Sequence, residues 1–264
     1  MKLAAAIAAG TLLMVGGSAD AGRATQVTLQ GALTSERISG FGTMTPARDG
    51  GRARLTLQRE SDAGWAKVAS KWIRLRGASD SDGDGRRDST FSASFPSPAE
   101  GSCRLKVRVP RTERYEAARV SYRMPCARPD FPTGTATLIP LSPVSPQTEI
   151  AVEIADTDPL RQFGLMFKRR LAAERGTAFE FEQPTSGGFW MKNTLIPLSI
   201  AFYSTDGTIV AIMDMEPCEP EASEADQCPT YDPQTTYQGA LEVNLGAFER
   251  WGIAEGDRIV VTRS

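Results

Sequence analysis

Short stretches in which apolar and polar residues alternate fill the chain between residues 24 and 126. In RARLTLQR, residues 52–59, Ala53, Leu55 and Leu57 fall on one face of a strand and the polar residues between them on the other. Seven such stretches at fairly regular spacing predict an antiparallel sandwich of the immunoglobulin-like type: ATQVTLQGAL, RISGFGTM, RARLTLQR, GWAKVASKWIRL, STFSASFP, CRLKVRVP and ARVSYRMP.

The last part of the chain is also rich in strand patterns. They occur at TEIAVEIA, TAFEFE, FWMKNT, LSIAFY, TIVAIMDM, GALEVNL and RIVVTR. Because strands outnumber helices, we expect a compact antiparallel sheet or barrel with one or two short helices. The fold class is therefore mainly β in both parts.

Two helices interrupt these strands. The first is predicted to begin at Thr157 or Asp158, with a buried stripe at Leu160, Phe163, Gly164, Phe167 and Leu171. A glycine inside a helix is unfavourable, so Gly164 is expected to mark a close backbone approach or an early helix end. The second helix, AFERWG, is predicted to end at Gly252.

A proline-rich stretch separates the two parts. Five prolines lie between residues 127 and 147, a density typical of a stiff connector. We assign residues 22–128 to the immunoglobulin-like sandwich, 129–133 to a linker and 134–264 to a second domain. TATLIPL is interpreted as the first edge strand of that domain.

The first 21 residues have the features of a secretion signal. Lys2 precedes an apolar run, and Ala19, Asp20 and Ala21 form an A-x-A cleavage site. The alternative, a membrane anchor, needs about 20 consecutive apolar residues, and this run is shorter. We expect an exported protein that is periplasmic, bound to the cell wall or secreted.

Composition excludes several classes of function. The net charge is −2 and the basic residues look scattered along the sequence, so no nucleic-acid partner is expected. The absence of histidine excludes His-dependent triads and imidazole-ligated zinc. G-x-S-x-G and phosphate-binding glycine motifs are also missing. We expect a monomer without a cofactor.

Four cysteines allow three disulfide connectivities. The local pairing, Cys103 with Cys126 and Cys218 with Cys228, keeps each pair inside one predicted domain and fits an exported protein. Free structural thiols are the alternative.

An acidic stretch, DSDGDGRRDS, repeats the ligand spacing of an EF-hand. Asp80, Asp82, Asp84 and Asp88 occupy positions 1, 3, 5 and 9. Phe91 stands where the bidentate glutamate belongs, so any calcium site here is expected to be weak. The alternative is an acidic, solvated hairpin loop.

The FWMKNT stretch raises the question of what a lysine does between apolar residues. A strand would put Trp190 and Lys192 on one face, and burial of Lys192 would demand a partner, for which Glu242 in GALEVNL is the best candidate. A structural ion pair, a ligand site and a catalytic lysine remain three alternatives.

Several motifs resemble the domain of unknown function 192 family. They are GLM within VEIADTDPLRQFGLMFKRRL, then FWMKNTLIPLSIAFYSTDGTIV, CPTY, LEVNLG and WGIAEGDRI, over about residues 148–264. The resemblance implies a small β-rich fold, with Trp190, Met191, Lys192 and Asn193 as hallmark and Glu242 in the LE motif. The family usually has an aspartate where this chain has Ser199, which removes a carboxylate that could pair with Lys192.

These observations favour a binding or accessory module of the cell envelope over an enzyme. The predicted ligand is small and polar or anionic, and its site comprises Trp190, Met191, Lys192, Asn193 and Glu242. A His-independent enzyme using Lys192 and Glu242, or a purely structural protein, are the alternatives.

Overall fold

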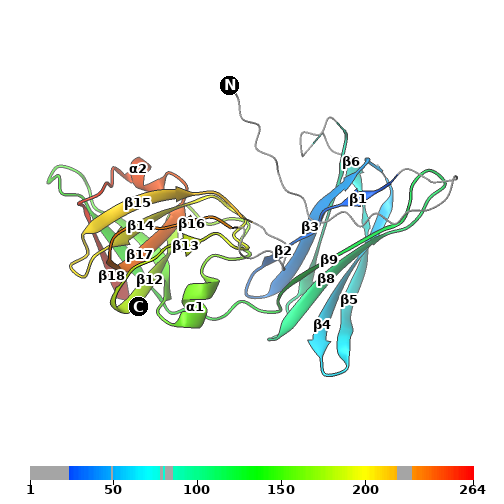
Figure 1. Cartoon of the computed structure of the whole chain (residues 1–264), viewed down its shortest axis with the longest axis horizontal. Coiled ribbons are helices and arrows are strands. Elements are labelled where there is room, and N and C mark those ends of the chain that lie inside the picture. The colour runs from blue at the N-terminus through cyan, green and yellow to red at the C-terminus, as the bar shows by residue number, and fades with distance from the viewer. Residues whose placement is uncertain (1–23, 49, 78–79, 81–85, 219–227) are drawn as a thin grey trace. The chain divides into compact units, whose positions relative to one another are not determined.

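A computed structural model describes residues 24–48, 50–77, 80, 86–218 and 228–264. The chain forms two compact units, divided between Arg128 and Pro129 (Figure 1). Both units are mainly β, as predicted. The predicted signal, residues 1–21, lies outside the described residues. Within the described part, no helix has the length and apolar character needed to cross a membrane.

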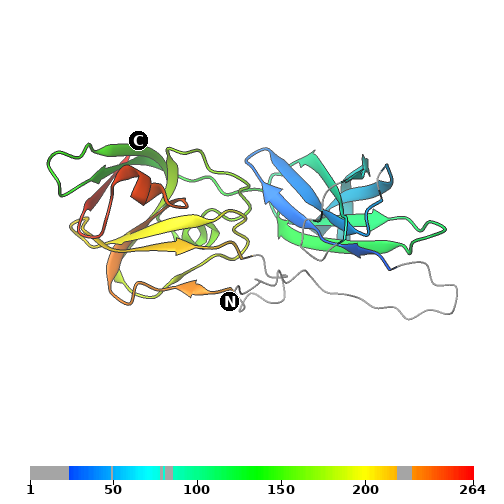
Figure 2. The ribbon, with the colours of Figure 1, turned by 90° about the horizontal axis from the view of Figure 1, so that it is seen from above.

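The first unit is a sandwich of two antiparallel sheets, seen as layers in Figure 2. One sheet contains β1 (Gln26–Val27), β2 (Gln30–Leu33), β3 (Arg37–Thr45), β6 (Arg76–Gly77) and β7 (Ser89–Pro96). The other has the order β5 (Gly64–Arg74), β4 (Arg52–Ser61), β8 (Ser102–Val109) and β9 (Ala118–Pro125). All seven predicted stretches contain a strand, so the sandwich is confirmed, while its immunoglobulin-like class stays a prediction.

The alternation of apolar and polar residues correctly predicts which side chains of these strands are buried. Ala53, Leu55 and Leu57 of β4 are fully buried, whereas Arg54 is exposed. The same holds for β8, whose apolar positions fill the core. The predicted disulfide between Cys103 and Cys126 is confirmed and joins the start of β8 to the residue after β9.

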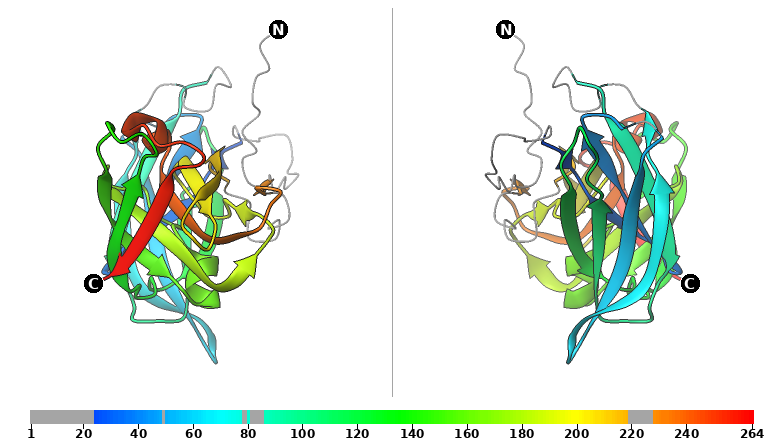
Figure 3. Two further views of the ribbon diagram at one scale, coloured as in Figure 1. Left: turned by 90° about the vertical axis from the view of Figure 1, so that its left-hand side faces the viewer. Right: turned by 90° about the vertical axis from the view of Figure 1, so that its right-hand side faces the viewer.

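The second unit is built on a seven-stranded sheet. Its order is β15 (Ile209–Met215), β14 (Leu198–Tyr203), β17 (Tyr237–Asn244), β12 (Arg175–Thr185), β11 (Thr148–Ala155), β10 (Thr133–Ile139) and β18 (Arg258–Arg263). Only the pair β11–β12 is parallel among its pairings. The edge strands approach each other through a bridge between Thr208 and Arg258, which curls the sheet into a half-barrel (Figure 3).

Apolar side chains cover both faces of this sheet. On one face Leu241 and Val243 pack with Phe248 of α2 (Ala247–Trp251). On the other face Ala240 packs in a cluster that includes Leu160 of α1 (Asp158–Phe163). The central part of β17, residues 239–243, is therefore buried on both sides.

Three expectations differ from the structure. The first helix stops at Phe163, because Gly164 takes φ 43° and ψ −126°, so the predicted stripe to Leu171 is not one helix. TATLIPL forms β10, which lies between β11 and β18 rather than at an edge. The predicted linker, residues 129–133, falls within the second unit, since Phe131 packs against its core and the Pro132 carbonyl accepts a hydrogen bond from the Ile154 N–H.

Candidate functional site

The W-M-K-N residues lie where a very short strand ends. Strand β13 contains only Phe189 and Trp190 and pairs with β16 (Thr230–Tyr231). Met191 then turns fully into the core, while the indole of Trp190 stays 43% exposed. The Lys192 Nζ lies 5.1 Å from the centre of the Trp190 ring, so the prediction that these two side chains share a face is confirmed.

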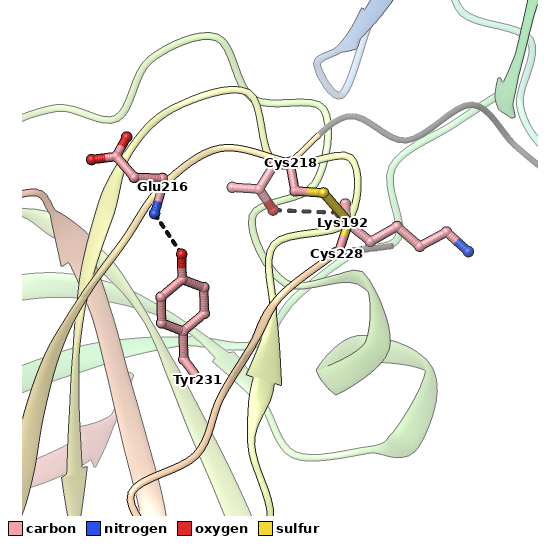
Figure 4. The surroundings of a disulfide bond; sticks show 6 residues. Lys192, Glu216, Cys218, Cys228 and Tyr231 are labelled. Atoms are coloured by element: carbon pink, nitrogen blue, oxygen red, sulfur yellow. Dashed lines mark hydrogen bonds between the residues drawn. A yellow bond between two sulfur atoms is a disulfide. The ribbon is translucent and has the colours of Figure 1, made fainter. Parts of the chain in front are cut away.

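The expected burial of Lys192 is wrong. The side chain is half-buried and extends away from the neighbouring disulfide (Figure 4). The strand ends before Lys192, and the chain turns so that the ammonium can remain hydrated above the indole. A cation over an exposed aromatic ring contributes about 0.5–1 kcal/mol. Lys192 therefore does not need a buried counter-ion.

Covalent and backbone contacts fix this turn. The predicted disulfide between Cys218 and Cys228 is confirmed, and Cys218 forms β-bridges with Lys192 and Thr194 (Figure 4). Beside it the Glu216 N–H donates to the Tyr231 hydroxyl at 3.0 Å. The Trp190–Lys192 pair is thus presented by a constrained segment.

A turn at Phe167 is hydrogen-bonded to the turn that follows Trp190. The N–H of Phe167 donates to the carbonyl of Asn193 at 2.8 Å. Both residues have positive φ, 63° for Phe167 and 55° for Asn193, which is uncommon for residues with a side chain. The GLM and W-M-K-N motifs, far apart in sequence, are therefore two strained turns that hold each other. Such strain is often found at functional sites.

Glu242 is buried in the covered face of the sheet. It is 4% exposed, and burial raises the pKa of its carboxyl to about 8. Within the described part of the chain it forms neither a salt bridge nor a hydrogen bond. The predicted Lys192–Glu242 pair is therefore wrong: the carboxyl avoids an unpaired buried charge by binding a proton at neutral pH.

Strand pairing surrounds Glu242 with groups that the sequence analysis missed. Thr177 of β12 lies opposite it, and the buried Thr177 hydroxyl has no hydrogen-bond partner among the residues that the structure describes. Thr177 in turn pairs with Glu153 of β11, whose carboxylate binds Lys168 at 2.9 Å. Gly164 closes the other side, since a Cβ there would lie 3.8 Å from the Glu242 Oε2.

This arrangement can hold a proton but does not form a catalytic pair with Lys192. A neutral carboxyl in a dry environment can donate or accept a hydrogen bond, and its charge changes near pH 8. Lys192, Asn193 and Glu242 do not converge in one cleft as expected. Glu242 is buried on β17, whereas the Lys192 ammonium lies over the indole of Trp190.

Ser199 lies on the opposite side of the sheet from Glu242. Its hydroxyl donates to the Asp214 carboxylate and accepts a hydrogen bond from the Gly246 N–H at 2.8 Å. Its strand neighbours Leu198 and Ile200 instead belong to the cluster under α1. A carboxylate at residue 199 would therefore lie on the side of the sheet away from Glu242 and from the cluster that contains Met191, the residue next to Lys192.

The acidic stretch of the first unit is described only in part. Asp82 and Asp84 lie outside the described residues, and Asp80 is exposed. Asp88 is fully buried and accepts a hydrogen bond from the Thr45 hydroxyl, so it serves the interior of the sandwich. Among the described residues, no group of three or more acidic or cysteine side chains is placed to hold a metal ion. Weak calcium binding stays a prediction.

A separate cavity opens on the second unit. It has a volume of about 460 Å³ and is lined by residues that include Glu180, Tyr203, Gln238 and Arg258. Burial raises the pKa of the Tyr203 hydroxyl well above its usual value, so that group stays protonated. None of the predicted site residues lines this cavity.

A family model matches most of the second unit. Residues 142–261 match the family model DUF192, described as an uncharacterized ACR. The predicted resemblance is confirmed for this part of the chain. No curated protein matches the sequence.

Two solved structures resemble part of the chain. One is a proposed transcription regulator from Sinorhizobium meliloti 1021, with 27% identity and a TM-score of 0.44, covering 51% of this chain and 98% of that one. The other is a protein of unknown function from Novosphingobium aromaticivorans DSM 12444, with 28% identity and a TM-score of 0.42, covering 48% of this chain and 83% of that one.

Proposed function

We propose that this protein is an exported accessory module of the cell envelope that binds a small polar or anionic ligand on its second unit. The observation that carries the proposal is the exposed Trp190 indole with the Lys192 ammonium above it, held by a disulfide-linked segment. An indole offers an apolar platform with little loss of conformational entropy, and the ammonium offers a charge-assisted hydrogen bond.

Export is supported by two features. Both disulfides join cysteines within one unit, as expected for a protein that folds in an oxidising compartment. The first residues add the pattern of a cleavable signal. The first unit would then be an immunoglobulin-like spacer or dock for the ligand-binding unit.

Binding is tested by titrating the full mature chain with inorganic phosphate, succinate and glucose, using tryptophan fluorescence and calorimetry. We expect at least one probe to bind the wild type. Trp190→Ala and Lys192→Met should each weaken binding by about tenfold or more, because each removes one of the two side chains proposed to contact the ligand.

The matched control is Arg250→Met, which removes an exposed cation of the same unit outside the platform. It should bind like the wild type. The unfolding free energy of Lys192→Met should fall by only about 1 kcal/mol, since the ammonium is partly hydrated. Equal binding by Lys192→Met and the wild type, or no binding of any probe, would contradict the proposal.

A further inference from the structure

The outer face of the four-stranded sheet in the first unit carries an array of basic side chains. Successive cross-strand partners in one row are Trp72 of β5, Arg54 of β4, Arg108 of β8 and Arg119 of β9. In sequence these residues are up to 65 positions apart. Antiparallel pairing alone brings the three guanidiniums side by side on one face.

Two further rows repeat the pattern. Thr56, Lys106 and Ser121 are neighbours in the next row, and Gln58, Arg104 and Arg123 follow in the third. We call the surface formed by six of these side chains the basic face: Arg54, Arg104, Lys106, Arg108, Arg119 and Arg123. Neighbouring strands lie about 4.8 Å apart and alternate residues about 6.8 Å apart, so the charges form a dense array.

The cations of the basic face lack acidic partners in the described part of the chain. Among the described residues, none of the six forms a salt bridge. The acidic side chain on this side of β4 is Glu60, at the far end of the strand. Like charges directly opposite each other, such as Arg54 and Arg108, destabilise a sheet, so a bound anion would relieve repulsion within the basic face.

Aromatic and polar neighbours hold the guanidiniums in place. Arg104 lies 4.4 Å and Arg123 5.4 Å from the centre of the Trp65 ring. Arg104 also donates twice to the Gln58 Oε1, at 3.1 and 2.9 Å, and the Arg54 Nε donates to the Ser70 hydroxyl at 2.8 Å. Because each guanidinium has five N–H donors, several remain for an external anion.

We propose that the basic face binds an acidic polysaccharide. Carboxylate or sulfate groups along such a chain match the grid of cations, and bidentate binding by arginine suits both groups. The hydroxyls of Thr56 and Ser121, together with the 59% exposed indole of Trp72, can contact sugar rings between the charges. This site is separate from the Trp190–Lys192 platform and does not depend on it.

Two other polyanions fit these observations less well. Stacking of successive nucleic-acid bases needs several free aromatic rings, and insertion into a lipid layer needs a broad apolar surface, whereas the exposed Trp72 indole is a single ring with the Arg54 guanidinium 5.9 Å from its centre. Two guanidiniums already lie over the Trp65 ring. A flexible acidic polysaccharide can follow the twist of the sheet and needs only outward N–H groups and hydroxyls.

The test uses the full mature chain and measures binding to polygalacturonate by calorimetry at about 50 mM salt, with neutral dextran as control ligand. The variant Arg54→Gln/Lys106→Gln/Arg108→Gln removes half of the basic face. We expect wild-type binding that weakens steeply with salt, and at least about tenfold weaker binding by the triple variant.

The matched control, Arg37→Gln/Arg76→Gln/Arg111→Gln, removes three exposed arginines that lie elsewhere in the first unit. It should bind within about twofold of the wild type. If both triple variants bound polygalacturonate equally weakly, the loss would come from the change in net charge alone, and the proposal would be overturned. Absence of wild-type binding, or tighter binding to a single-stranded oligonucleotide or to phosphatidylglycerol vesicles, would overturn it as well.

Discussion

The polar sides of two strands, β4 in the first unit and β17 in the second, have opposite environments. Arg54 of β4 faces water from the open side of its sheet. Glu242 of β17 faces a layer that includes the Gly164 turn and is 4% exposed. The same alternation of apolar and polar residues therefore produces a charged surface in one unit and a neutral, buried acid in the other.

The difference is caused by what covers the second face of each sheet. Alternation sorts side chains into two sets, but it does not decide whether the second set meets water or another layer. In the second unit, α1 and the segment around Met191 contribute to that layer. Covering a carboxyl in this way favours its protonated form, whereas an open sheet keeps arginine hydrated.

The largest expected effect is a dependence of stability on pH that Glu242 confers on the second unit. Its folded-state pKa of about 8 lies above the ordinary 4.5, so the protonated form is the stabilised one. Stability should be complete below about pH 4.5, fall as the pH rises to about 8 and then level off. The total loss is up to about 5 kcal/mol.

Urea unfolding of the wild type and Glu242→Gln between pH 5 and 9 measures this effect. The stability of Glu242→Gln relative to the wild type should increase with pH over the window. Glu249→Gln removes an exposed carboxylate of the same unit and should keep the wild-type dependence. Parallel curves for the wild type and Glu242→Gln would show that Glu242 is not the titrating group.

The disulfides should stabilise the two units by similar amounts. Sequence separations are 23 for Cys103–Cys126 and 10 for Cys218–Cys228. Replacing either pair by serine should lower the unfolding free energy by about 3 kcal/mol, with the first pair costing about 0.7 kcal/mol more because its loop is longer. Urea unfolding of both variants checks this, and a much larger effect in the second unit would mean that its disulfide relieves strain in the Lys192 turn.

Gly164 should tolerate substitution less well than Gly252. In Gly164→Ala the backbone conformation is unfavourable and the new Cβ would lie 3.1 Å from the Phe179 ring, so we expect a loss of about 1–3 kcal/mol. Gly252 ends α2 in the left-handed region with open space around it, so Gly252→Ala should cost about 1 kcal/mol. Thermal unfolding of both variants compares them, and equal losses would exclude crowding at Gly164.

The smallest effect is expected on the basic face. Neutralising Arg54, Lys106 and Arg108 removes repulsion between neighbouring strands and should raise the unfolding free energy of the first unit by less than about 1 kcal/mol. Urea unfolding at low and high salt tests this, because salt should stabilise the wild type more than the variant. A marked loss of stability would indicate that the basic side chains stabilise the fold by packing instead of being available to bind an anion.

Much of the fold was predictable because it depends on local patterns. The strands of the sandwich, the helix that ends at Gly252 and the pairing of cysteines within each unit all follow from residues close in sequence. The first helix was predicted too long because its apolar spacing continues beyond Gly164. The backbone of this glycine ends the helix, a possibility that the sequence raised without deciding it.

The candidate site was predicted only in part. Trp190 and Lys192 lie together as predicted, but the turn after Trp190 brings them together and not the predicted strand, which ends at Trp190. Lys192 and Glu242 were paired only because a buried lysine would need an acid. The turn at Met191 leaves the ammonium near water, so this need disappears. Thr177 was missed because only the pairing of β12 with β17 places it beside Glu242.

The sequence by itself determined which residues of each strand lie on the same face, since that depends only on the two-residue period of the backbone. Tertiary structure decided which strands are neighbours and which faces are covered. Arginines that look scattered in the sequence meet on one sheet because β4, β8 and β9 pair in antiparallel register. Glu242 becomes a neutral acid because a second layer excludes water from it, and such long-range contacts leave no mark on the local pattern.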